Sequence, residues 1–133
     1  ERLIERRMDR IAGSWGFHKV KHRPESKVFF NEVTNNFKGI EWIFTKEGDV
    51  MKIQHQTSDT TFGEFEIVAN ECPDEGGDHD EGNYSILLHM TNKSVDYPKV
   101  DHIVWEDATI SNGKITAHEN ADKGRYRYIL KKH

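Results

Sequence analysis

Apolar and polar residues alternate with a period of two in one segment after another, from Trp15 to the end of the chain. Ile40, Trp42 and Phe44 show this alternation most strongly, and segments 84–90 and 125–130 repeat it. A period of two is typical of strands with one buried face, whereas an amphipathic helix repeats every three to four residues. About eight such segments follow one another at spacings of about 8–12 residues, with no helical pattern between them. The chain is therefore expected to be all-β.

Short turn sequences separate several of these segments. Lys46-Glu47-Gly48-Asp49 lies between two alternating runs, and Asn112-Gly113 is the dipeptide favoured by two-residue type I′ hairpins. Parallel strands would need crossover helices, which the pattern does not show. A meander of hairpins closes without long crossovers, so we predict an antiparallel up-and-down β-barrel rather than a sandwich. A chain of 133 residues has the length of one domain, so we expect a single domain over positions 1–133.

The first dozen residues follow a different period. Apolar side chains recur there at helical spacing, at Leu3, Ile4, Met8 and Ile11. This spacing predicts a short amphipathic helix over residues 1–12. Gly13 follows directly and is the kind of residue at which helices end.

Composition excludes several classes of protein. A net charge of -4 argues against a nucleic-acid partner, which normally requires a basic surface. No run of about 20 apolar residues is present, so no transmembrane segment is expected. Cys72 is the only cysteine, which rules out an intramolecular disulfide and a cysteine-based zinc site. The chain starts at Glu1 without methionine, so we expect a processed or truncated product from which any targeting peptide has been removed, with room for a lipid anchor upstream of Glu1.

Gly13-Ser14-Trp15 stands between the predicted helix and the first strand. This arrangement resembles the lipocalin-like (calycin) β-barrel family, in which a Gly-x-Trp opens the first strand and its Trp closes one end of the barrel. The resemblance implies that a late arginine, Arg125 or Arg127, packs across Trp15. The chain is also similar to lipocalin-like secreted and lipoprotein domains of Bacteroidetes, which carry a hairpin like Trp42 to Gly48. The resemblance to these Bacteroidetes domains implies a periplasmic, outer-membrane-anchored or secreted location.

Several aromatic residues lie on the apolar faces of alternating strands. If the barrel holds a ligand, we expect five of them to contact it: Trp42, Phe44, Tyr84, Trp105 and Tyr126. Rings usually line small-molecule sites, and a barrel of about eight strands is either filled by side chains or holds one small ligand. Both outcomes remain open from the sequence.

Polar residues give weaker signals. On one regular strand His18 and His22 would face the same side about 13 Å apart, too far for one metal ion. His55, His89, His102 and His118 lie on separate strands, and their convergence cannot be read from the sequence. The acidic stretch Cys72–Asn83 predicts a solvated loop and does not match an EF-hand, and weak binding of calcium by this loop stays open. We therefore predict no metal site and no cofactor.

No nucleophile elbow, phosphate loop or metalloprotease motif is present. The sequence therefore favours a binding protein over an enzyme, although a site assembled across strands is not excluded. The first hypothesis is a barrel of the bacterial envelope that binds a small hydrophobic or aromatic ligand. The alternative is a filled barrel that binds a protein or glycan through its exterior or its acidic loop. The sequence indicates neither the identity of a ligand nor the oligomeric state.

Overall fold

The computed structural model describes residues 2–69, 84–92, 99–121 and 124–133. A helix, α1 (Arg2–Ile11), precedes the first strand, and a single 3-10 turn, η1 (Thr34–Phe37), lies between the second and third strands. The strands are β1 (Gly13–Pro24), β2 (Asn31–Glu32), β3 (Ile40–Phe44), β4 (Asp49–Gln54), β5 (Asp59–Ala69), β6 (Tyr84–Asn92), β7 (Lys99–Ser111), β8 (Lys114–Ala121) and β9 (Gly124–Lys132). The predicted acidic loop, Cys72–Asn83, lies outside the described residues.

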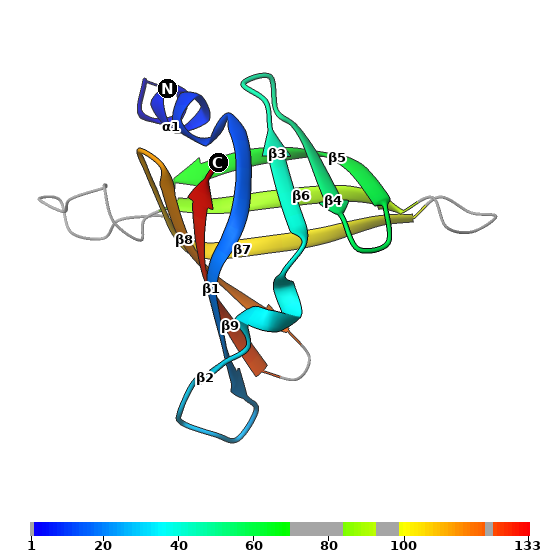
Figure 1. The fold of residues 1–133 in the computed structure, drawn as a ribbon. Coiled ribbons are helices and arrows are strands. Elements are labelled where there is room, and N and C mark those ends of the chain that lie inside the picture. The colour runs from blue at the N-terminus through cyan, green and yellow to red at the C-terminus, as the bar shows by residue number, and fades with distance from the viewer. Residues whose placement is uncertain (1, 70–83, 93–98, 122–123) are drawn as a thin grey trace, which may run out of the picture.

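The strands form one antiparallel meander that closes on itself. From β3 to β9 each strand pairs with the next, and β1 pairs with both β3 and β9. Among the described strands, short strand β2 pairs with β1 alone and is not part of the closed ring (Figure 1). In the part of the chain that the structure describes, eight strands therefore form a closed barrel, which confirms the predicted all-β fold class. The helix and the barrel together are consistent with a calycin-like fold.

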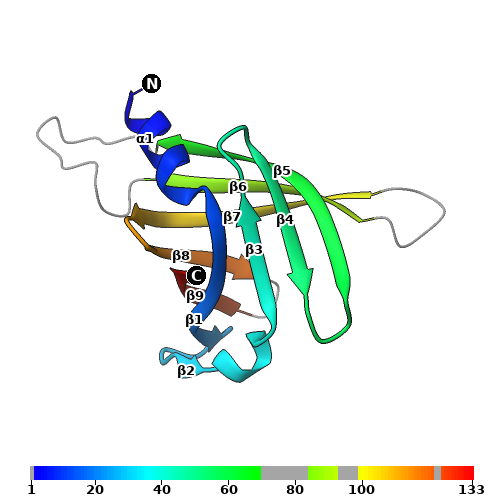
Figure 2. The ribbon, with the colours of Figure 1, turned by 45° about the horizontal axis from the view of Figure 1, so that its top comes forward.

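The two ends of the barrel differ. Helix α1 lies across the end at which β1 starts, and β2 and η1 lie at the opposite end (Figures 1 and 2). We call the half beneath α1 the closed half and the half beside η1 the open half. No helix in the described ranges is long and apolar enough to cross a membrane.

Both predicted turn sequences join neighbouring strands. Gly48 has a φ of 100° in the turn between β3 and β4, where the Thr45 N–H donates to the Asp49 carbonyl at 2.9 Å. Asn112-Gly113 forms the two-residue link between β7 and β8. Gly113 has a φ of 86°, but Asn112 does not have a positive φ. The link is therefore not the predicted type I′ turn, which requires a positive φ at both residues.

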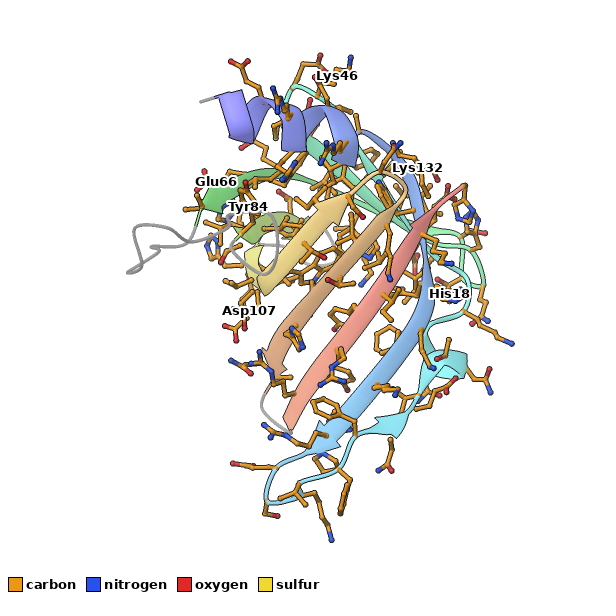
Figure 3. The ribbon with its side chains drawn as sticks, turned by 90° about the vertical axis from the view of Figure 1, so that its left-hand side faces the viewer. His18, Lys46, Glu66, Tyr84, Asp107 and Lys132 are labelled. Atoms are coloured by element: carbon orange, nitrogen blue, oxygen red, sulfur yellow. The ribbon has the colours of Figure 1, made fainter. Side chains whose placement is uncertain are left out.

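Two β-bulges change which residues face inward. In β1 the pairing with β9 shifts between Phe17 and Lys19, so that His18 is exposed (Figure 3) and His22 packs on the Tyr126 ring at 4.5 Å. The expectation that His18 and His22 share one face was wrong, because an inserted residue reverses the alternation.

The second bulge lies in β7 at Asp107, whose φ is 51°. It allows Trp105 and Ala108, three positions apart, to be buried together. The alternation therefore resumes beyond the bulge, and β7 runs on to Ser111.

Trp15 joins helix α1 to the barrel. Its side chain is fully buried, and its indole N–H donates to the Ile11 carbonyl at 2.7 Å. The cation across its ring is Lys132, with Nζ 5.4 Å from the ring centroid, at the α1 end of the barrel (Figure 3). The expectation of Arg125 or Arg127 at this position was wrong.

Both arginines are engaged elsewhere. Arg125 pairs with Glu106 at 2.6 Å and Asp107 at 3.2 Å, and Arg127 lies over the Phe30 ring at 4.3 Å. Lys132, at the end of β9, is the direct cross-strand partner of Trp15 in the closed half. Arg125 and Arg127 come earlier in β9 and therefore lie towards the open half.

Apolar side chains fill the closed half. Phe44 and Tyr84 are almost fully buried there, with the guanidinium of Arg7 on α1 lying 5.1 Å from the Tyr84 ring centroid. The aliphatic residues buried with them include Val50, Ile67, Ile110, Ile115 and Leu130.

We predict that Trp15→Ala lowers the free energy of unfolding by about 3–5 kcal/mol, because it removes a fully buried ring and leaves a cavity under α1. Phe17→Ala, in the same strand but half-buried, is expected to cost less. Phe29→Ala removes a ring that is 79% exposed and should change stability by at most about 0.5 kcal/mol. Urea unfolding measures all three variants. A loss below about 1 kcal/mol for Trp15→Ala would contradict the role given to this residue.

Candidate functional site

The open half of the barrel contains a cavity of about 200 Å³. Five aromatic rings line it: Phe17, Phe37, Trp42, Trp105 and Tyr128. The remaining lining residues are Ile40, Ile103, Lys52 and Glu119. These residues come from six strands and from η1, so the cavity exists only when the barrel has closed.

The rings form a connected wall. Trp42 and Trp105 meet edge to face with centroids 5.2 Å apart, and Trp105 lies 5.7 Å from Tyr128. Phe17 contacts both Tyr128 and Phe37 at 5.2 Å. Because each ring is held by another ring, the wall is fixed in shape before any ligand arrives.

Phe37 reaches the cavity because η1 is fixed to β1. The Val33 N–H donates to the Val20 carbonyl at 2.8 Å, and the Thr34 hydroxyl accepts from the Val20 N–H at 3.1 Å. These bonds hold the 3-10 turn beside β1 where β3 no longer pairs with it. The turn therefore supplies the side chain that fills this part of the wall.

Glu119 is the acidic residue of the cavity. The Tyr128 hydroxyl donates to its carboxylate at 2.8 Å, and the Trp105 indole N–H also donates to it. Burial raises the pKa of Glu119 above its ordinary value, and these two hydrogen bonds and the charge of Lys52 oppose the rise. Burial and the adjacent carboxylate also raise the pKa of Tyr128, so its phenol keeps its proton and remains a donor.

Lys52 is the basic residue of the cavity. It pairs directly with Trp42 across β3 and β4, and its Nζ lies 5.4 Å from the centroid of the Trp42 ring. Within the described residues no carboxylate lies within salt-bridge distance, 4.0 Å, of this ammonium group. Its positive charge therefore faces an aromatic ring and acts on Glu119 only at longer range.

The structure brings together two of the five residues predicted to contact a ligand. Trp42 and Trp105 line the cavity. Phe44 and Tyr84 lie in the filled closed half, and Tyr126 stacks on Tyr128 with centroids 5.9 Å apart. All five contribute to the barrel interior, and the ligand contact of each remains a prediction.

Lys52, Glu119 and Phe37 line the cavity but were not predicted from the sequence to do so. Lys52 follows Val50 at an even spacing, and Glu119 follows Ile115 and Ala117 in the same way. That parity was a usable signal, because a strand directs every second side chain to the same face. Phe37 gave no comparable signal, since it belongs to a single 3-10 turn.

A second hollow, of about 400 Å³, lies where β1 and β3 separate, and Glu41, His55 and His133 are among its lining residues. Glu41 accepts from the Ser14 hydroxyl and contacts His55 Nε2 at 2.7 Å. These two hydrogen bonds, that of Ser14 first, hold the pKa of Glu41 below its ordinary value. Because its carboxylate is already bonded to two neighbours, this hollow is a weaker candidate for a ligand site.

One pair of histidines does converge. Nδ1 of His89 and Nδ1 of His102 lie 2.7 Å apart across β6 and β7. In residues 2–69, 84–92, 99–121 and 124–133, however, no three His, Cys, Asp or Glu side chains are placed to hold one metal ion.

Comparisons with known protein families, with curated proteins and with solved structures find no match for this chain. The geometry of the cavity therefore carries the functional argument.

The raised pKa of Glu119 predicts a distinctive dependence of stability on pH. Above its ordinary pKa of 4.5 the folded state holds this proton more tightly than the unfolded state, so the Glu119 contribution to stability falls as pH rises through the folded pKa. The glutamine of the Glu119→Gln variant does not ionise, so this variant does not lose stability in this way as pH rises. Its stability relative to the wild type should therefore increase from mildly acidic to neutral pH.

Urea unfolding across that pH range measures the effect. Glu47→Gln, in the exposed turn between β3 and β4, controls for the loss of one negative charge. A wild-type protein and a Glu119→Gln variant whose stabilities change in parallel with pH would contradict the burial of this carboxyl.

Proposed function

We propose that this protein binds a small organic molecule with one or two rings inside the open half of its barrel. The observation that carries the proposal is the cavity of about 200 Å³ lined by five aromatic side chains, next to a closed half that apolar side chains fill. Rings supply large apolar contact area and stacking surfaces, and they line most small-molecule sites.

The volume of the cavity sets the size of the ligand. A buried apolar cavity of about 150 Å³ is large enough to bind benzene, and sites for drug-sized ligands usually measure about 300–1,000 Å³. A space of about 200 Å³ therefore suits a one-ring or compact two-ring compound. Long acyl chains and four-ring compounds exceed this volume.

The proposal includes a lipocalin-like mode of binding and a location in the bacterial envelope, either periplasmic, anchored to the outer membrane or secreted. The support is the resemblance of Gly13-Ser14-Trp15 and the Trp42 to Gly48 hairpin to that family, together with the helix and closed barrel. A signal peptide or lipobox cysteine encoded upstream of Glu1 tests the location independently of ligand binding.

Filling the cavity should abolish binding. We predict that Ile103→Phe, which adds a ring to the lining, weakens the binding of phenethyl alcohol at least about tenfold. Val104→Phe is the matched control, because Val104 is the next residue of β7 and is 44% exposed. It should bind like the wild type.

Fluorescence of the tryptophans, excited where phenethyl alcohol does not absorb, measures this binding because Trp42 and Trp105 are part of the wall. Equal loss in both variants, or no saturable response in the wild type, would contradict the proposal. The latter result would favour the alternative function, contact with a protein or glycan through the exterior.

A further inference from the structure

The proposed function leaves open which polar group the ligand carries, and the inference drawn here rests on that function. We infer that the ligand is a small aromatic or cyclic acid, whose carboxylate is bound by Lys52 while its ring lies against the aromatic wall. The assignment follows from which polar groups of the cavity already have partners.

The acceptor of the cavity is already engaged. Glu119 receives hydrogen bonds from the Tyr128 hydroxyl, at 2.8 Å, and from the Trp105 indole N–H. Both donors belong to rings of the wall, so Glu119 holds these rings in place. A ligand cation would have to compete with two donors that the fold itself supplies.

The cation of the cavity has no comparable partner. Lys52 is half-buried, and in the described part of the chain no carboxylate approaches its Nζ within 4.0 Å. Its Nζ instead lies over the face of Trp42, 5.4 Å from the ring centroid. A cation over a ring is stabilised less than a cation in a charge-assisted hydrogen bond with a carboxylate. Lys52 is therefore the group that gains most from a ligand.

The positions of the two residues also fit one ligand. Lys52 is the direct cross-strand partner of Trp42, and both line the same cavity. A ring placed against Trp42 and Trp105 would therefore have Lys52 beside its edge. A carboxylate one or two bonds from the ring could reach this ammonium while the ring remains among aromatic side chains.

Glu119 adds a condition on pH. The groups facing it are Lys52 on β4, Trp105 on β7, and Tyr128 and the direct cross-strand partner of Glu119, Tyr126, on β9. An anion bound at Lys52 stands near the Glu119 carboxylate, and the repulsion between them ends when Glu119 takes up a proton. Binding of the acid should therefore strengthen from neutral towards mildly acidic pH, provided that the ligand itself stays ionised.

Three probes of one size test the inference: phenylacetate, phenethyl alcohol and phenethylamine are an anion, a neutral molecule and a cation at neutral pH. Calorimetric titration of the wild-type protein should show phenylacetate binding about tenfold more tightly than the alcohol, and the amine most weakly. In Lys52→Met, which keeps the apolar stem, the ratio between phenylacetate and the alcohol should fall to about one. Lys114→Met removes an exposed lysine from β8 and should keep the wild-type ratio.

The outcomes separate the two proposals. Tightest binding of phenethylamine, or an unchanged ratio in Lys52→Met, would overturn the choice of an acid and leave the binding of ring compounds intact. Failure of all three probes to bind would overturn the proposed function as well.

Discussion

The barrel depends on the pairing of β1 with two different neighbours. Its first residues, Gly13 to Gly16, pair with β3, while most of its length pairs with β9. Strands of the closed ring therefore pair with both edges of β1 only in the closed half. Beyond Gly16, β1 no longer pairs with β3, and β2 and η1 lie along that edge of β1 instead. This change of partner explains why one half of the barrel is filled and the other contains a space.

The two halves of the barrel are packed differently because β1 has different partners in each. In the closed half strands on every side are bonded to one another, and Trp15 and the aliphatic core fill the narrow interior. In the open half a single ring from η1, that of Phe37, meets Phe17 and Tyr128. The barrel also admits two ionisable side chains there, Lys52 and Glu119. Buried ionisable groups are costly unless they have partners, so their presence in a cavity is a sign of function.

The periodicity of two was enough to predict the strands and the closed meander, because it reports one buried face per strand. It did not predict the two bulges. An extra residue near His18 or at Asp107 reverses the parity, and neither position carries a distinctive residue type. The cation at Trp15 was misassigned for a related reason. The partner of Trp15 is set by the register of β9 against β1, which places Lys132 there and which sequence spacing does not give.

The candidate site was only partly predictable. Large aromatic residues on alternating strands indicated an interior lined by rings, and Trp42 and Trp105 do line the cavity. Which rings surround a space and which fill the closed half depends on where β1 leaves β3. Phe44 and Tyr84 lie on the filled side of that point. Lys52 and Glu119 were passed over because charged residues in strands usually face solvent.

The most direct test of the account is to locate a bound ring compound by NMR, through nuclear Overhauser effects between the probe and isoleucine methyl groups. The account predicts contacts from phenylacetate to Ile40 and Ile103, which line the cavity, and none to Ile110 or Ile115 of the closed half. Contacts confined to the outer face, at Val104 for example, would contradict the claim that the open half of the barrel is the binding site.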